Sequence, residues 1–211
     1  CIRGPEDNVL ERYKITQDRV KADIIVRITG DVPLVDYKLV DQLVKKMIEE
    51  CSDFITLPSG TKTVHEGIDP FTSKALEKLW QVARADNSAK EHVTGYIKNH
   101  PDQFKISYLS LDYYPNVSGA RFSVDTPADL LFFKKIYEHL NVPVGEAEID
   151  QVVELLKRLP ELVDINSHVY QKKINDITRK VLIRCDGGKK IGLGHIYRCS
   201  ALAKIFREKL G

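Results

Sequence analysis

Apolar and polar residues follow one another along most of the chain in a pattern that predicts strands and helices in turn. Residues 22–29 and 53–57 are short runs rich in β-branched or aromatic side chains, which is typical of strands. The first run is apolar on both faces, as expected in a parallel sheet that is covered on both sides. Between the two runs, residues 36–50 carry apolar side chains at the i, i+3, i+4 spacing of an amphipathic helix.

Further helices are predicted where apolar positions recur with helical spacing. They cover residues 6–14, 73–85, 90–99, 126–140 and 149–159, and one more strand is predicted at residues 104–111. Thr126 and Pro127 form a clear start signal, because a threonine N-cap and a proline at the first helical position both favour a helix start. Ser73 is expected to cap the helix that begins there. Residues 58–72 contain two prolines and two glycines and are predicted to be a loop.

The alternation of strands and helices predicts a three-layer α/β domain, which we expect to span residues 1–164. Residues 165–179 are polar and mixed, and we expect a linker or an interdomain helix there. Residues 180–211 restart the pattern with a predicted strand at 181–186, a glycine-rich turn and a helix at 196–210. This is the first βα unit of a second, Rossmann-like domain.

The composition excludes several classes of protein. Hydrophobic residues make up 43% and charged residues 29% of the 211 residues, so the chain can bury a core and is not intrinsically disordered. A net charge of +2 gives no argument for nucleic-acid binding. There is no membrane-length apolar run and no signal-peptide pattern. The four cysteines lack zinc-site or redox-motif spacing, which predicts reduced thiols in a cytoplasmic protein.

Two aspartates supply the main candidate chemistry. Asp31 and Asp125 each follow a β-branched or aromatic run, at the expected carboxyl end of a strand. Open α/β sheets bind ligands at that edge, and Mg²⁺ typically takes one or two carboxylates together with substrate phosphates. The pair therefore predicts metal-assisted chemistry on a nucleotide. The alternative is that each aspartate caps a helix or a turn, because Asp-Val-Pro and Asp-Thr-Pro are both good turn formers.

Other polar residues near these positions are candidates for substrate binding. Arg27 and Arg121 lie close to the two aspartates in the sequence, and a guanidinium recognises phosphate or carboxylate groups. Their alternative role is an ion pair that neutralises the acidic residues. Residues 65–69 form a polar segment that contacts a substrate or is a plain surface loop. His92 either hydrogen-bonds a substrate anion or has a structural hydrogen bond.

A glycine-rich turn supplies separate candidates near the end of the chain. Gly192 and Gly194 let the backbone approach a ligand, and the N-terminus of the following helix attracts anions. His195 in that turn is a candidate general base near neutral pH. Such turns are common in α/β folds, so the histidine is the more specific part of the signal.

Four motifs in order and spacing resemble one family. They are residues 3–13, 26–34, 91–94 and 124–130. The resemblance is to cytidylyltransferases of the spore-coat polysaccharide type, relatives of acylneuraminate and Kdo cytidylyltransferases, and it covers about residues 1–170. It implies a nucleotide-diphospho-sugar transferase-like α/β/α sandwich. It also implies transfer of CMP from CTP to an acidic, nonulosonic-type (sialic acid-like) sugar with release of pyrophosphate, in surface polysaccharide or glycan biosynthesis.

The resemblance assigns roles to individual residues. Asp31 and Asp125 would bind Mg²⁺ beside the triphosphate, and Glu66, Gly67 and Asp69 would face the sugar. Relatives of this type are often homodimers, and no nucleic acid or membrane partner is implied.

Both ends of the chain look cut. No methionine precedes Cys1, a new βα unit stops at Gly211, and the family's glycine-rich loop that holds CTP has no counterpart before Cys1. We therefore expect a window on a longer protein that does not catalyse on its own.

Residues 181–210 resemble the start of the UDP-sugar hydrolases of the pseudaminic acid pathway, which have a GT-B glycosyltransferase-like fold. Residues 191–199 match their first loop, and His195 falls on the catalytic histidine. The resemblance implies a UDP-sugar as a second substrate and a bifunctional full-length protein. Two alternatives stay open: the hydrolase is the main activity, or the first domain is a catalytically dead sugar- or nucleotide-binding module.

Overall fold

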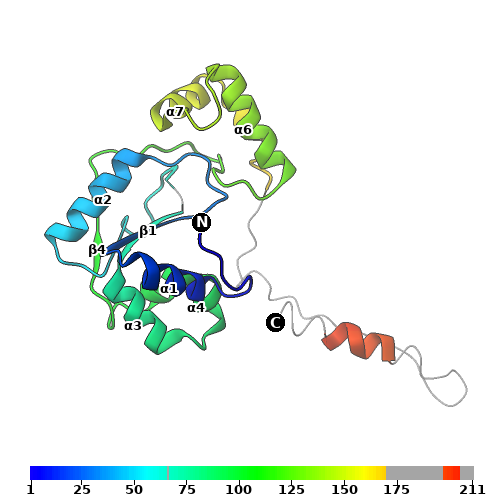
Figure 1. The fold of residues 1–211 in the computed structure, drawn as a ribbon. Helices are drawn as coiled ribbons and strands as arrows, with labels where there is room; N and C mark the ends of the chain where they lie inside the picture. The colour runs from blue at the N-terminus through cyan, green and yellow to red at the C-terminus, as the bar shows by residue number, and fades with distance from the viewer. Residues whose placement is uncertain (66, 170–196, 205–211) are drawn as a thin grey trace, which may run out of the picture. The chain divides into compact units, whose positions relative to one another are not determined.

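The computed structural model describes residues 1–65, 67–169 and 197–204. The chain divides into two compact units, Cys1–Val169 and Tyr170–Gly211. The first unit contains an open sheet with helices on both faces (Figure 1). In the second unit, residues 197–204 are helical, within the helix predicted there, whereas the predicted strand and glycine-rich turn before it lie outside the described residues.

Four strands form a mixed sheet in the order β1-β3-β2-β4. They are β1 (Ile24–Ile28), β2 (Phe54–Thr56), β3 (Ile68–Thr72) and β4 (Ile106–Tyr108). β3 runs antiparallel to β1 and β2, and β2 runs parallel to β4. The carboxyl ends of β1, β2 and β4 therefore lie at one edge of the sheet, together with the start of β3.

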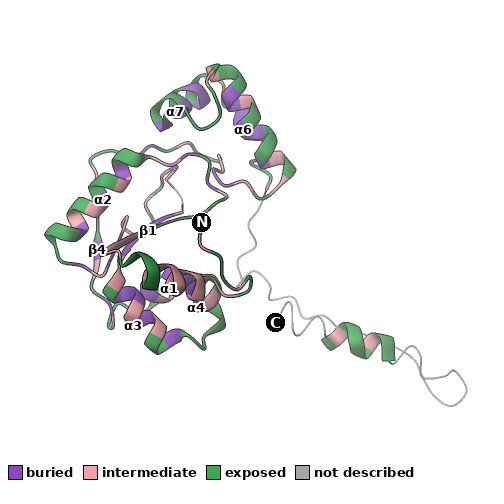
Figure 2. Cartoon of the chain, viewed as in Figure 1, coloured by how far each residue is buried: buried purple, intermediate pink, exposed green. Residues whose placement is uncertain are grey.

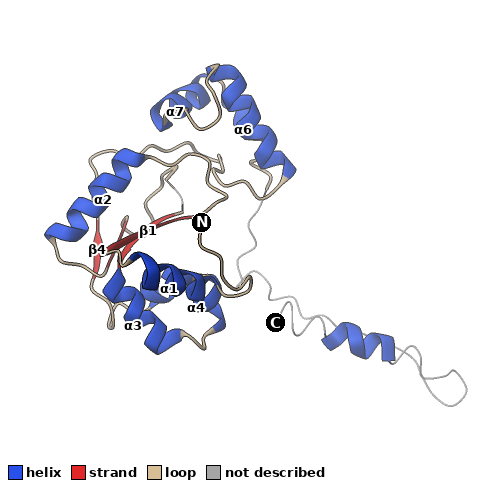
Figure 3. Cartoon of the chain, in the orientation of Figure 1, coloured by secondary structure: helices blue, strands red, loops and turns tan. Residues whose placement is uncertain are grey.

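Helices cover both faces of the sheet (Figure 3). One layer contains α1 (Val9–Val20), α3 (Ser73–Ala83), α4 (Asn87–Glu91) and α5 (Val93–Asn99), and the other contains α2 (Tyr37–Glu49). Successive side chains of a strand point to opposite faces. Accordingly Ile25 and Phe71 pack with the first layer, whereas Val26 and Ile68 pack with α2. This arrangement confirms the predicted three-layer α/β/α sandwich.

The remaining helices form an apolar cluster of their own. They are α6 (Pro127–Leu140), α7 (Ile149–Arg158) and the 3₁₀ helix η1 (Pro160–Ile165), whose buried positions are marked in Figure 2. The rings of Phe122, Phe132 and Phe133 meet edge to face, with centroids 5.4–6.5 Å apart. Leu34 and Val64 also belong to this cluster, so the segments that flank the sheet edge are packed against it.

Local side-chain signals set the starts of several helices. The Asp36 carboxylate accepts the Lys38 amide at 2.9 Å and begins α2 close to its predicted start. Thr126 caps α6 and Pro127 occupies its first turn, as predicted. The prediction of Ser73 as the cap of α3 was wrong, because the Thr72 hydroxyl accepts the Ala75 amide at 3.1 Å.

The prediction of a loop at residues 58–72 was wrong, because β3 lies within it. Gly67 and Pro70 are local turn signals, but β3 is paired on both sides, by β1 and by β2. Pairing and burial of Ile68 and Phe71 outweigh the local preference. The same strand makes the sheet mixed, which corrects the predicted parallel sheet.

Other elements differ from their predicted bounds. The predicted helix at 90–99 is two helices, α4 and α5, because His92 has non-helical dihedrals (φ −111°, ψ 63°). The first helix begins later than predicted and continues to Val20. The strand predicted at 104–111 is shorter, and the run that ends at Asp125 is not a strand. Element bounds are therefore set partly by tertiary contacts, which sequence periodicity does not contain.

Within the described residues, no helix combines the length and apolar character that crossing a membrane requires. Cys1, Cys51 and Cys199 carry free thiols. The thiols of Cys1 and Cys51 are exposed, whereas Cys199 is half-buried. Cys185 lies outside the described residues.

The packing of the apolar cluster formed by α6, α7 and η1, here called the α6 cluster, can be tested by mutation. Phe132 is fully buried, whereas its neighbour Leu131 is 47% exposed. We expect Phe132→Ala to lower the free energy of unfolding by about 3–5 kcal/mol, because it removes buried apolar area and leaves a cavity. Leu131→Ala is the matched control and should change it by less than about 1 kcal/mol. Urea denaturation measures both, and equal losses would contradict the assigned packing.

Candidate functional site

The sheet edge and the chain before α6 bring the two predicted metal-binding aspartates onto neighbouring backbone segments. Asp31 lies in the turn after β1, and Asp125 precedes the N-cap of α6. The Val124 amide donates a hydrogen bond to the Asp31 carbonyl oxygen at 2.7 Å. Asp31 and Asp125 are distant in sequence, so long-range contacts such as this hydrogen bond bring their backbone segments together.

Neither aspartate caps a helix. Thr126 caps α6, and within the described part of the chain the Asp31 carboxylate makes no hydrogen bond or ion pair. The turn-capping alternative therefore does not account for either side chain. A carboxylate at the edge of an open sheet, without a protein partner, is available to a ligand.

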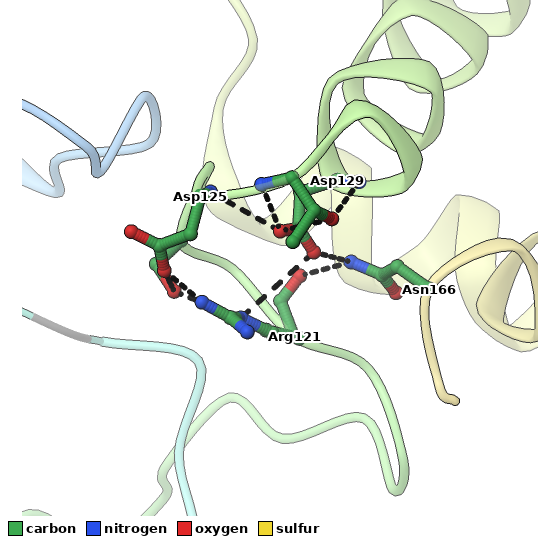
Figure 4. A network of polar contacts seen from close by, with 6 residues as sticks. Arg121, Asp125, Asp129 and Asn166 are labelled. Carbon is green, nitrogen blue, oxygen red and sulfur yellow. Dashed lines mark hydrogen bonds and ion pairs between the residues drawn. The ribbon is translucent and has the colours of Figure 1, made fainter. Parts of the chain in front are cut away.

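Arg121 neutralises Asp125 (Figure 4). Its guanidinium Nη2 donates to Asp125 Oδ2, and its Nε donates to the Ser123 hydroxyl at 3.1 Å. The Asp125 side chain is 44% exposed, whereas that of Arg121 is only 14% exposed. The geometry therefore matches the ion-pair alternative for Arg121, and it leaves the carboxylate open to solvent.

A buried carboxylate, Asp129, fixes the backbone that carries Asp125 (Figure 4). Its Oδ2 accepts the amides of Asp125 and Thr126 at 3.1 and 2.9 Å and the Thr126 hydroxyl at 2.9 Å. Its Oδ1 accepts the Asn166 side-chain amide at 3.1 Å and lies 3.8 Å from Arg121 Nε. Hydrogen bonds and a nearby guanidinium together compensate the burial of this charge.

Sequence reasoning missed Asp129 and Asn166 as parts of the site. The spacing of Thr126 and Asp129 matches a capping box, in which each side chain bonds the other's backbone amide, so Asp129 could have been found. Asn166 carries no comparable signal, because its partners lie 37 and 45 residues earlier in the chain.

Gly67 lets the preceding loop approach the turn that carries Asp31. Its φ is +63°, and a Cβ there would lie 2.2 Å from Thr29 Oγ1 and 2.9 Å from Val32 Cγ2. Its carbonyl oxygen accepts the Thr29 amide at 3.2 Å. Only glycine satisfies both the left-handed φ and this close approach. Glu66 lies outside the described residues.

Asp69 is the centre of a second polar network, on the face of β3 that α5 covers. It lies opposite Arg27 in the sheet and is 5% exposed. Its Oδ2 accepts Arg27 Nη1 at 3.2 Å and the Thr94 hydroxyl at 2.7 Å, and its Oδ1 accepts Lys98 Nζ at 2.7 Å. Arg27 is therefore paired with Asp69 and not with Asp31. The predicted contact of Asp69 with a sugar stays a prediction.

The two histidines near the site differ in environment. His92 is exposed, at the junction of α4 and α5, and its side chain makes no capping hydrogen bond. The His65 side chain is 3% exposed, with Nε2 3.8 Å from Asp36 Oδ2, and its Nδ1 has no hydrogen-bond partner within the described part of the chain. Burial lowers the pKa of His65, and the charges of Asp36 and Asp150 partly oppose this shift.

The donors present at the sheet edge fit a magnesium ion only in a substrate complex. Among the residues that the structure describes, there is no group of three or more His, Cys, Asp and Glu side chains that would hold a metal alone. Mg²⁺ usually needs only one or two carboxylates, since phosphate oxygens and waters complete its octahedron. Asp31 and Asp125 supply such hard oxygen donors.

Gly192, Gly194 and His195 lie outside the described residues, so the hydrolase hypothesis stays a prediction.

Comparison with known proteins identifies relatives of this chain. The sequence model of the family described as "Cytidylyltransferase" matches residues 1–175. An uncharacterized protein of Methanocaldococcus jannaschii is 33% identical over 178 residues, which cover 83% of this chain and 70% of that protein. The spore coat polysaccharide biosynthesis protein SpsF of Bacillus subtilis is 26% identical over 160 residues, which cover 76% of this chain and 65% of that protein.

A solved structure has the same fold. It is a cytidylyltransferase from Leptospira borgpetersenii serovar Hardjo-bovis, with a TM-score of 0.67 and 26% identity over 80% of this chain and 70% of that chain. This similarity confirms the predicted nucleotide-diphospho-sugar transferase-like sandwich. The chain spans about two thirds of the length of the curated relatives that it matches.

The Asp69 network predicts a large loss of stability when its charge is removed. Asp69→Asn leaves the Arg27 and Lys98 cations without their carboxylate, and we expect the free energy of unfolding to fall by about 3 kcal/mol. Asp18→Asn, which breaks an exposed ion pair with Lys14, is the control and should have little effect. Urea denaturation measures both variants. Similar small changes in both would show that Asp69 is not a structural centre.

The buried His65 predicts a pH dependence of stability. Its pKa in the folded state lies below the unfolded value of 6.5, so the unfolded state binds a proton first as the pH falls. Neutral His65 therefore contributes to the free energy of unfolding above pH 6.5. This contribution is lost as the pH falls below 6.5, at no more than about 1.4 kcal/mol per pH unit. We expect His65→Gln to flatten the decline in unfolding free energy between neutral and mildly acidic pH. His92→Gln, at an exposed position, should leave the slope unchanged, and equal slopes in all three proteins would contradict the assignment.

Proposed function

The chain belongs to the cytidylyltransferase family, and we propose that it transfers CMP from CTP to an acidic sugar, with release of pyrophosphate. In this reaction a sugar hydroxyl forms a bond to the α-phosphorus while the bond to the β-phosphate breaks. The Bacillus subtilis relative is named for spore coat polysaccharide biosynthesis, which supports a role in making a surface polysaccharide or glycan.

The hydrogen bond from Val124 to Asp31 is the observation that carries the proposal. It brings two surface carboxylates, Asp31 and Asp125, to the edge of the sheet where α/β proteins bind ligands. Asp125 can change its ionic partner without disturbing the cap of α6, because Thr126 has that function, and Asp31 has no side-chain partner within the described residues. Two such carboxylates suit the Mg²⁺ complex of a nucleoside triphosphate.

Asp31 and Asp125 would hold the magnesium ion of Mg-CTP. When bound, this ion supplies positive charge that polarises the α-phosphate and offsets the charge of the departing pyrophosphate. Arg121 keeps the Asp125 carboxylate oriented through its ion pair. A cation at Asp125 would compete with this ion pair, and the released Nη2 group of Arg121 would then be able to bind an anionic group of the substrate, while Nε stays with Ser123.

Arg27 supports the acidic class of sugar. Asp69 anchors one of its N–H groups, and within the described residues its other N–H groups have no partner. A guanidinium held in this way can bind a carboxylate through two parallel hydrogen bonds. We propose that the sugar carboxylate uses Arg27, with Glu66 and Gly67 facing the sugar and His92 as a further hydrogen-bonding group.

The metal carboxylates provide the test. In the full-length protein, Asp31→Asn and Asp125→Asn should each lower Mg²⁺-dependent release of pyrophosphate about 100-fold or more, because each removes a ligand of the ion that stabilises the transition state. Both variants should fold normally, as judged by circular dichroism, because neither side chain is buried. Asp41→Asn, at an exposed position of α2, is the matched control and should keep wild-type activity.

Wild-type turnover in both variants would overturn the proposed mechanism. CTP binding without turnover in the wild-type full-length protein would favour a binding module instead. The sugar class is tested separately, by comparing pyrophosphate release with a nonulosonic acid and with a neutral hexose. Release with the neutral sugar alone would contradict the acidic substrate.

A further inference from the structure

We propose that Asn166 is a positioning residue that holds the Asp125 carboxylate in place for a divalent cation, acting through Asp129. This inference rests on the proposed function of Asp125 and adds to it a buried residue that follows η1. Asn166 is fully buried and follows η1, so it cannot itself contact a substrate. Its effect must therefore reach Asp125 through other protein groups.

A single amide group clamps both ends of the loop that carries Asp125. Asn166 Nδ2 donates to the Arg121 carbonyl oxygen at 2.9 Å and to Asp129 Oδ1 at 3.1 Å. Arg121 lies four residues before Asp125 and Asp129 lies four residues after it, so the two hydrogen bonds fix the span between them (Figure 4).

Asp129 transmits this restraint to Asp125. Its second oxygen, Oδ2, accepts the amides of Asp125 and Thr126. The backbone direction at Asp125, and therefore the direction of its side chain, follows from where the Asp129 carboxylate is held. Without Asn166, the Asp129 Oδ1 would keep only the guanidinium of Arg121 nearby, at 3.8 Å.

The Asn166 side chain donates two hydrogen bonds, while one of its own polar atoms has no partner. Its Oδ1 is buried and has no hydrogen-bond partner within the described residues, which is unfavourable for folding. An apolar side chain would avoid this cost, but it would leave the buried Asp129 Oδ1 without its amide donor, so Asn166 contributes to folding as well as to the position of the loop. What an apolar residue cannot supply is the pair of N–H donors that hold Arg121 and Asp129.

Residues that orient a metal ligand without touching the metal typically change its affinity 10–100-fold when mutated. We therefore expect Asn166→Ala to raise the dissociation constant of Mn²⁺, titrated into the full-length protein with CTP and followed by electron paramagnetic resonance, about tenfold. The Mg²⁺ concentration for half-maximal pyrophosphate release should rise in parallel. The rate at saturating Mg²⁺ should change much less, and the amides of residues 125 and 126 should exchange faster with deuterium.

Leu162→Ala is the matched control. Leu162 is buried in the same cluster, 6% exposed, but has no part in the polar clamp. It should lower thermal stability while leaving Mn²⁺ affinity unchanged. If Asn166→Ala does not fold, Asn166→Ser keeps one donor and should weaken Mn²⁺ binding to a smaller extent.

Wild-type Mn²⁺ affinity in the folded Asn166 variant would overturn the proposal, and so would an equal loss of affinity in Leu162→Ala. Asp125→Asn separates this failure from failure of the proposed function. If Asp125→Asn loses Mn²⁺ binding and the Asn166 variant does not, only the positioning role is wrong. If Asp125→Asn also binds Mn²⁺ normally, the metal site and the role of Asn166 are both wrong.

Discussion

A main-chain hydrogen bond, from the Val124 amide to the Asp31 carbonyl oxygen, joins the sheet to the segment that leads into α6. Asp31 belongs to the turn after β1, whereas Asp125 belongs to the chain that enters a separate helical cluster. The two carboxylates therefore depend on contact between parts of the molecule that have different cores. Leu34, three residues after Asp31, is buried in the helical cluster. Packing and hydrogen bonding therefore both hold the turn after β1 against the segment that leads into α6.

Four aspartates with the same chemistry have different roles because their surroundings differ. Asp69 and Asp129 are buried, and several donors hold each of them, so both act as structural anchors. Asp125 is partly exposed and has one ionic partner, whereas Asp31 has none within the described residues. An exposed carboxylate with few protein bonds can bind a cation at low cost, while a buried carboxylate cannot leave its partners.

Asp31 and Asp125 as a metal-binding pair stay a prediction, and the structure brings their backbone segments together, although one of the reasons for the prediction was wrong. Asp31 does follow a strand, but the residues before Asp125 do not form one. The hydrogen bond to Asp31, and not membership of the sheet, places Asp125 at the edge. The contact of Gly67 with a substrate stays a prediction, whereas its left-handed φ and its close approach to Thr29 give a steric reason for a glycine there. Asn166 could not be predicted, because neither periodicity nor spacing relates it to partners so far away in the chain.

The sequence predicts the three-layer class and the starts of α2 and α6 correctly, because caps and periodicity act over a few neighbouring residues. It also carried the motifs that identify the family. Three features depend on contacts between distant parts of the chain: the antiparallel pairing of β3, the ion pair of Arg27 with Asp69, and the hydrogen bonds of Asn166 to Arg121 and Asp129. A buried charge or amide needs a hydrogen-bond partner. Packing of distant segments decides which group lies within hydrogen-bond distance, and local sequence does not contain this information.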